Sequence, residues 1–408
     1  MAGVVLALLA FAATTTAYAA PTFSDPVDVA PGDTLASGVP SATYNGADIL
    51  EIGWATLNVD EETLLSTARR PLGGPFAPGP PIGGLGDAQG PVLATAPGGQ
   101  IFAAWVNDDS RIVASQLGDD GTPLGPVTIS AAEEEASDPA IAVGADGRVA
   151  IAWTVLDELG ENGVVYAVHG ALGLPLVIHA VSTGEPNAIT PDVAFDSAGV
   201  LQVAFTSASE DEAGRIKVAA ETLLGPFAAS RFVSPEGALA SEPSIAPAPE
   251  GGLAIAWTEA TATGLTVKVG VEPTPDAAFS TVDVPGGGAP TAPRLVVDPA
   301  TGTVTVAWVR LSNADDAVGA ALVATRAGGR CPSRRRRSYL APMPCSNPTW
   351  PSRRPAMPWS PGGASSQVTR TPTFAPQCSM PPAGRRRHHR VRRRRRVRRH
   401  RRHPPCRR

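Results

Sequence analysis

The chain has 408 residues, of which 43% are hydrophobic and 18% are charged, and its formal net charge is −4. Residues 1–327 hold all 38 acidic residues against nine Arg and two Lys, and they contain no cysteine. This acidity argues against nucleic acid or an anionic membrane as a partner of that part. Its length is sufficient to bury a large core without disulfides.

The N-terminus resembles a secretory signal peptide covering residues 1–19. An apolar run from Val4 to Ala13 precedes Ala17-Tyr18-Ala19, although no Lys or Arg stands before Arg69. The run is too short to span a bilayer, and no other segment qualifies. We therefore expect an extracellular or cell-surface protein without a membrane span.

An aromatic residue behind a very small residue then recurs about every fifty-one positions. The aromatic residues are Trp54, Trp105, Trp153, Phe205, Trp257 and Trp308, and the small ones are Gly53, Ala104, Ala152, Ala204, Ala256 and Ala307. A fixed period of this size is typical of repeat architectures. We expect the aromatic rings to be buried between neighbouring repeats, with carbohydrate stacking as the alternative role.

Each copy of the repeat predicts four short strands. In residues 139–155, an apolar run leads to a Gly-containing turn and then to the alternating run Val149–Trp153, which together indicate a hairpin. Two weaker strands follow, at Gly163–Val168 and Leu176–His179; in the preceding copy they are Arg111–Gln116 and Pro126–Ser130. Four strands per unit of about fifty residues are typical of a propeller blade.

The fold class that follows is all-β, a six-bladed β-propeller over residues 22–327. The blades lie at about 40–85, 91–131, 139–182, 191–235, 243–285 and 293–327. The segment 26–30 is predicted to be the outer strand of the last blade and to close the ring, which would leave few free sheet edges. Seven blades or an open array are the alternatives.

From residue 328 the composition changes abruptly, because residues 328–408 contain 23 Arg, no acidic residue and all four cysteines. A tail that binds nucleic acid or another polyanion is one interpretation. A metal site is a second, but the spacing of Cys331, Cys345, Cys378 and Cys406 matches no ligand pattern. The favoured interpretation is out-of-frame translation, since a shifted frame turns acidic or Thr/Ala-rich GC-rich coding into Arg, Pro and Ser. In either case the tail is predicted to be disordered.

Motifs for hydrolases, phosphate binding and dinucleotide binding are absent from the sequence. Carboxylates recur after the repeat aromatic, however, in turns expected on the same face as the linkers between blades. Oxygen-rich clusters of this kind suit calcium, so weak metal candidates are Asp108, Asp109, Asp157, Glu158, Glu210, Asp211, Glu212, Asp315 and Asp316. Glu259 belongs to the same series. Solvated turn residues without a ligand are the alternative.

The repeat frame P-x-I/V/L-A-x-x-x-x-G-x-V/L-x-V/I-A-W resembles secreted repeat proteins of high-GC actinobacteria and, at the level of the fold, six-bladed sialidase-like propellers. This resemblance covers residues 22–327. The sialidase box S-x-D-x-G-x-T-W and the arginine motifs of that family are missing, so no catalytic residue and no cofactor-binding residue is carried over.

Three functions follow as hypotheses. The leading one is a monomeric, non-enzymatic extracellular propeller that binds a protein or glycan at the cell surface. The alternative is a sialidase-like glycoside hydrolase whose site lies in the central funnel, with two carboxyl groups about 5–10 Å apart. The third is polyanion binding through the Arg-rich tail. Charged side chains converging on the funnel would favour the enzyme.

Overall fold

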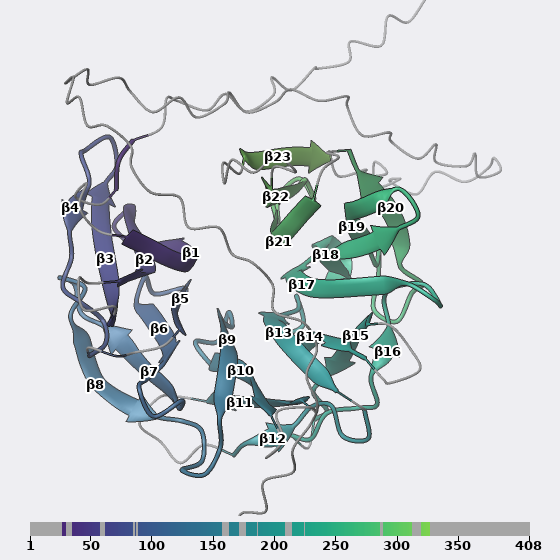
Figure 1. Cartoon of the computed structure of the whole chain (residues 1–408), viewed down its shortest axis with the longest axis horizontal. Coiled ribbons are helices and arrows are strands. Elements are labelled where there is room, and N and C mark those ends of the chain that lie inside the picture. Colours follow the sequence, from purple (N-terminus) through teal and green to yellow (C-terminus); the bar gives the residue numbers. More distant parts are fainter. Residues whose placement is uncertain are drawn as a thin grey trace, which may run out of the picture. The chain divides into compact units, whose positions relative to one another are not determined.

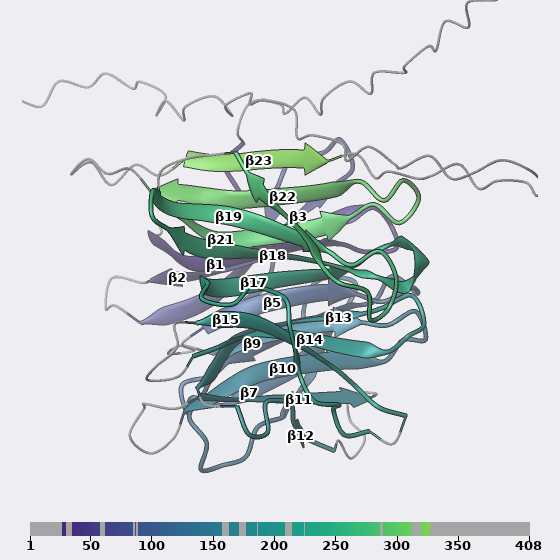
Figure 2. The ribbon, with the colours of Figure 1, turned by 90° about the vertical axis from the view of Figure 1, so that its right-hand side faces the viewer.

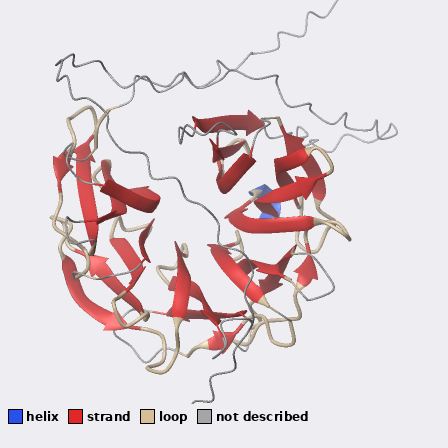
Figure 3. Cartoon of the chain, in the orientation of Figure 1, coloured by secondary structure: helices blue, strands red, loops and turns tan. Residues whose placement is uncertain are grey.

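The computed structural model describes residues 27–29, 35–57, 62–84, 86, 89–156, 163–170, 177–185, 187–208, 214–223, 225–285, 289–311 and 320–326. These residues form six antiparallel sheets arranged in a ring (Figure 1). Apart from one short 3-10 helix, Pro249–Gly251, the described elements are strands (Figure 3). The predicted all-β class and the six-bladed propeller are confirmed.

The sheets follow one another in chain order. The first sheet contains β1 (Leu35–Tyr44), β2 (Ile49–Leu57), β3 (Thr63–Pro71) and β4 (Ala77–Pro78). The second contains β5 (Gln89–Thr95), β6 (Ile101–Val106), β7 (Ile112–Leu117) and β8 (Pro123–Thr128). The third contains β9 (Ala136–Val143), β10 (Val149–Leu156), β11 (Gly163–Gly170) and β12 (His179–Ala180).

The remaining sheets repeat this order. The fourth contains β13 (Ala188–Phe195), β14 (Leu201–Ser207), β15 (Arg215–Ala220) and β16 (Arg231–Phe232). The fifth contains β17 (Leu239–Pro247), β18 (Leu253–Thr261), β19 (Gly264–Val271) and β20 (Ser280–Val284). The described part of the sixth contains β21 (Ala289–Val297), β22 (Val304–Leu311) and β23 (Ala320–Arg326).

Each strand pairs with its neighbour in the chain, so every connection inside a sheet is a hairpin. The first strand of every sheet lies nearest the centre of the ring in Figure 1, and the side view in Figure 2 shows strands running across the thickness of the ring. The hairpin turns therefore lie at its two faces. In one such turn Gly147, with φ of 82°, donates to the Gly144 carbonyl, a left-handed conformation that glycine adopts without strain.

Some predicted strand positions differ from those observed. β8 begins at Pro123 rather than at Pro126 because Pro123 and Leu124 already pair with β7 across a register shift. β12 is reduced to His179 and Ala180. Of the predicted closing strand 26–30, the structure describes only residues 27–29, which form no strand. Its pairing with the sixth sheet therefore stays a prediction.

The repeat aromatics are buried, as predicted. Their exposed fractions are 8% for Trp54, 3% for Trp105, 0% for Trp153, Phe205 and Trp257, and 4% for Trp308. The small residue before each of them lets the next sheet approach in five of the six sheets. A Cβ on Gly53 would lie only 2.6 Å from Pro91 Cγ of the second sheet, and Ala104, Ala152, Ala204 and Ala256 are fully buried.

The core of the described residues is divided between neighbouring sheets. Each cluster combines the aromatic of one sheet with apolar residues of the sheet before it. Trp153 packs with Ile112 and Ala114 of the second sheet, and Trp257 packs with Ile216 and Val218 of the fourth. Burial of these side chains at about 25 cal/mol per Å² of apolar area is the main force that joins sheet to sheet.

The predicted signal segment 1–19 and the tail 328–408 lie outside the described residues. Within the described part of the chain, no helix has the length and apolar character needed to cross a membrane.

Candidate functional site

The first strands of the six sheets share an irregularity near the centre of the ring. Each breaks register with its second strand close to the repeat proline. In five sheets the residue before that proline has positive φ: Gly90, Asp138, Thr190, Glu242 and Ala292, with values of 108°, 51°, 51°, 56° and 48°. Four of these are not glycine, and a left-handed residue of that kind is strained by about 1–3 kcal/mol. Such strain persists only where neighbouring groups fix the backbone.

Side chains of the preceding sheet fix three of these bulges. The Asp138 N–H donates to Gln89 Oε1 at 2.9 Å, and the Thr190 N–H donates to Thr154 Oγ1 at 3.2 Å. The Ala292 N–H donates to Glu242 Oε2 at 2.9 Å, and Glu242 also accepts from the hydroxyls of Thr258 and Thr291. Each bulge is therefore specified by a residue of the preceding sheet, which lies 49, 36 or 50 positions earlier in the chain.

A second set of contacts involves the residue after the repeat proline. Ser41 Oγ accepts from the Leu93 N–H at 2.9 Å, and Ser244 Oγ accepts from the Leu295 N–H at 3.1 Å. Asp192 Oδ2 accepts from the Ile245 N–H at 2.8 Å. These bonds join the first strands of adjacent sheets directly, so they stabilise the ring where the sheets are closest to its centre.

Of these three acceptors, only Asp192 carries an ionisable side chain. Its burial between β13 and β17 raises the pKa of the carboxyl above its ordinary value of 3.8. The charge of Arg294 on β21, the N–H groups of Ile245 and Val193 and the Ser244 hydroxyl act in the opposite direction but are outweighed. A carboxyl group that resists ionisation therefore lies on the inner strands.

This shift predicts a pH dependence that Asp192→Asn removes. Because the folded state binds the proton more tightly than the unfolded state, the carboxyl contributes most below pH 3.8, and the contribution is lost as pH rises through the raised pKa. The stability of the wild type relative to Asp192→Asn should decrease as pH rises from about 4 to 7, measured by urea unfolding. For the control Asp120→Asn, the difference in stability from the wild type should not change between about pH 4 and 7, since the N–H of Thr122 lowers the pKa of Asp120 below 3.8.

The start of each first strand lies at the same face of the ring as the turns between second and third strands. The Ala136 N–H donates to the Ser110 carbonyl, and the Ala240 N–H donates to the Gly214 carbonyl. The predicted proximity of these turns and the linkers is thus confirmed where the structure describes them. The exposed carboxylates of Asp108, Asp109, Glu133 and Glu135 lie on this face.

The metal candidates are only partly described. Asp108 and Asp109 lie exposed in the turn between β6 and β7, where the Ser110 N–H donates to the Asn107 carbonyl. The other seven lie outside the described residues: Asp157, Glu158, Glu210, Asp211, Glu212, Asp315 and Asp316. The described residues contain no group of three or more His, Cys, Asp or Glu side chains suited to a metal ion. A calcium site on this face stays a prediction.

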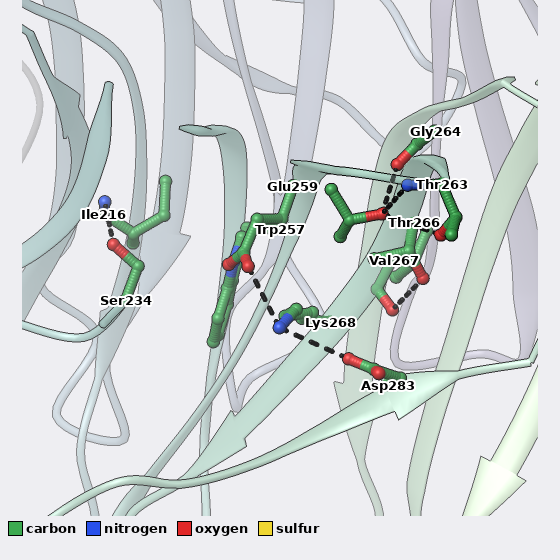
Figure 4. A network of polar contacts seen from close by, with 11 residues as sticks. Ile216, Ser234, Trp257, Glu259, Thr263, Gly264, Thr266, Val267, Lys268 and Asp283 are labelled. Atoms are coloured by element: carbon green, nitrogen blue, oxygen red, sulfur yellow. Dashed lines mark hydrogen bonds and ion pairs between the residues drawn. The ribbon is translucent and has the colours of Figure 1, made fainter. Parts of the chain in front are cut away.

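Glu259 was predicted in a turn, but the structure places it inside β18. Its side chain is 8% exposed, Oε2 accepts from the Trp257 indole N–H at 2.9 Å, and Oε1 lies 2.9 Å from Lys268 Nζ (Figure 4). Asp283 lies on the other side of Lys268, at 3.4 Å. Because β18 extends to Thr261, Glu259 lies inside the strand, two residues before its last residue. It is a structural partner of the repeat aromatic rather than a metal ligand.

Buried ion pairs were not predicted from the sequence. Arg69 Nε lies 2.6 Å from Glu51 Oε2, and Arg231 Nη2 lies 2.8 Å from Glu272 Oε2, with both carboxylates almost fully buried. Lys217 pairs with Glu185. The residues of each pair are 18 to 41 positions apart, so only the folded arrangement of the sheets and turns brings them together.

No protein-family model matches the sequence, and no curated protein matches it. Solved structures do match. A protein of unknown function from Dyadobacter fermentans DSM 18053 is 14% identical with a TM-score of 0.54, covering 72% of this chain and 95% of that chain. An ulvan lyase bound to GlcA(1-4)Rha3S is 11% identical with a TM-score of 0.50, covering 70% and 80%. The microbial sialidase Hadza Hz136 is 15% identical with a TM-score of 0.47, covering 66% and 62%.

These identities show a shared fold. The predicted resemblance is confirmed at the level of the fold by the structures with TM-scores of 0.54 and 0.50. The side chains at the inner ends of the strands therefore have to be judged by their own chemistry.

Proposed function

We propose that the protein is an extracellular propeller that binds a glycan near the start of the first strands of its sheets, around the centre of the ring. The proposed site, called the inner-strand cluster below, consists of Gln89, Asp138, Thr190, Ser241 and Glu242. Gln89 and Ser241 are exposed, and the other three are half-buried. Their amide, hydroxyl and carboxylate groups are suited to sugar hydroxyls, which need donors and acceptors held in fixed positions.

The observation that carries this proposal is the ring of fixed bulges. The bulge residues Asp138, Thr190 and Glu242 lie near the start of the first strands of three consecutive sheets, and the hydrogen bonds between sheets hold the Asp138 and Thr190 backbones in place. A preorganised site loses less entropy on binding. The ulvan lyase of similar fold supports the choice of a glycan over a protein, and the signal-like segment 1–19 supports an extracellular location.

Binding of neutral and acidic oligosaccharides, measured by glycan array and titration calorimetry, tests the proposal. Asp138→Asn removes a charge-assisted acceptor and retains a residue that tolerates positive φ, so it should weaken binding about tenfold, as expected for a lost bond of about 1.5 kcal/mol. Asp120→Asn changes a carboxylate in the turn between β7 and β8 and should leave affinity unchanged. Equal losses in both variants, or no binding of any glycan, would reject the site.

A glycoside hydrolase is the second candidate, favoured by the raised pKa of Asp192. A carboxyl that keeps its proton is what the general acid of such an enzyme requires. Release of reducing ends from a bound glycan would identify turnover. If Asp192 supplies the proton, Asp192→Asn should abolish release and preserve binding, since the Asn side chain still accepts the bond from the Ile245 N–H.

A further inference from the structure

Among the described residues, the sixth sheet has one face that no other sheet covers. In the second to fifth sheets the alanine before the repeat aromatic is fully buried against the following sheet, whereas Ala307 at the same position is exposed. Val296 and Val309, which lie on the same face in the register of β21 and β22, are 64% and 38% exposed. The opposite face, with Trp308, is packed against the fifth sheet. An apolar sheet face left in water indicates a missing neighbour.

The codons of the Arg-rich tail indicate what that neighbour is. A frame shifted by one base builds each codon from the third base of one present codon and the first two of the next. Applied to residues 347–362, NPTWPSRRPAMPWSPG, this frame permits the translation PDLAVAPAGDAVVAW. The observed copies include PDVAFDSAGVLQVAF at 191–205 and PAIAVGADGRVAIAW at 139–153.

Several positions of this translation follow without any choice of codon. In the shifted frame, the codon that spans Trp350 and Pro351 can encode only Ala, and so can the codon that spans Met357 and Pro358. The first of these two codons falls at the Ala of the repeat frame. The codon that ends on Trp350 encodes only Leu, Val or Met, and it falls at the third position of the frame, where the observed copies carry Ile141, Val193 and Ile245. Proline and aromatic stand fourteen residues apart, as they do in residues 91–105 and 243–257.

The distance along the chain also agrees with the repeat. The new aromatic position overlaps the codons of Pro361 and Gly362, 53 codons after Trp308, against intervals of 48 to 52 between the earlier aromatics. On either side of this segment, a CGN codon for Arg contributes only Ala, Pro, Ser or Thr in the same frame. The runs at 334–337 and 392–396 thus become small and polar, which is the composition of a flexible linker.

We propose that the natural reading frame encodes a seventh repeat, and that its sheet covers the exposed face of the sixth. The aromatic of that repeat would pack over Ala307 as Trp308 packs over Ala256. Val296 and Val309 would be buried in the same interface. The present chain forms six blades, and the repeat that completes the ring lies in the frame that its last residues do not use.

Sequencing the gene across the codons for residues 327–363 is the first test, with an insertion or deletion of bases as the expected result. A stop codon in the shifted frame within this interval would overturn the proposal. The second test compares the present chain with a frame-restored chain, each carrying Ala307→Cys and, in the present chain, serine at the four tail cysteines. Thiol labelling at position 307 should be slowed on the order of a hundredfold when the frame is restored, because a buried site reacts only on local opening.

Two further variants keep this comparison decisive. Ala256→Cys lies in a filled interface and should be protected in both chains, whereas Val309→Cys provides a second site on the exposed face. Equal labelling of positions 307 and 309 in both chains, with Ala256→Cys protected in both, would show that the restored segment does not cover the sixth sheet.

Discussion

Trp153→Ala should lower the free energy of unfolding by about 3–5 kcal/mol, because it removes a large buried ring and leaves a cavity that neighbouring sheets fill only partly. The Trp153 side chain is fully buried, it packs against residues of the second sheet, and its ring lies 6.1 Å from that of Tyr166. Urea unfolding followed by both fluorescence and circular dichroism measures the loss. Two probes are needed because repeat proteins with contacts only between neighbours can unfold in stages.

Substitution by Phe separates packing from hydrogen bonding. The Trp257 indole N–H donates to Glu259, whereas the Trp153 indole N–H has no partner in the described part of the chain. Trp257→Phe should therefore cost about 1–3 kcal/mol more than Trp153→Phe, since it removes a donor from a buried carboxylate. A Trp153→Ala variant that loses less than 1 kcal/mol would contradict the view that these rings join the sheets.

The fold was predictable because its signal is repeated six times. The tiny residue before each aromatic has one physical reason, the close approach of the next sheet, and Gly53 with Pro91 illustrates it. Period-two alternation in runs such as Val149–Trp153 then identified the second strand. Fourth strands as short as β12 carry too few residues to show any period, so their positions were less accurate.

The inner-strand cluster was not predictable. Positive φ at Asp138, Thr190 and Glu242 carries no glycine signal, and only the following proline marks the position. What specifies the first two bulges is an acceptor on the preceding sheet, Gln89 or Thr154, which no local pattern connects to them. The burial of Glu259 was missed for a related reason, since the strand runs two residues further than the alternation indicates.

Arg69→Met should destabilise the protein by about 3–5 kcal/mol at neutral pH, because it leaves the buried Glu51 carboxylate without its cation. Glu51 and Arg69 stand opposite each other in the register of β2 and β3, and the Glu51 side chain is fully buried. Gly121 of the second sheet closes over it, since a Cβ there would lie 3.2 Å from Glu51 Oε1. Burial raises the pKa of Glu51 above 4.5 even with Arg69 beside it.

The pH dependence of this loss identifies its cause. Without Arg69 the pKa of Glu51 rises further, so the carboxyl becomes protonated as pH falls toward 4.5, and the penalty should shrink relative to the wild type. The double variant Glu51→Leu with Arg69→Met removes both charges, and it should recover most of the stability because an apolar pair avoids the desolvation of two ions. Urea unfolding at pH 7 and about pH 4.5 measures both effects. A penalty that is independent of pH, or a double variant as unstable as Arg69→Met, would show that the guanidinium acts by filling space between the sheets and not by its charge.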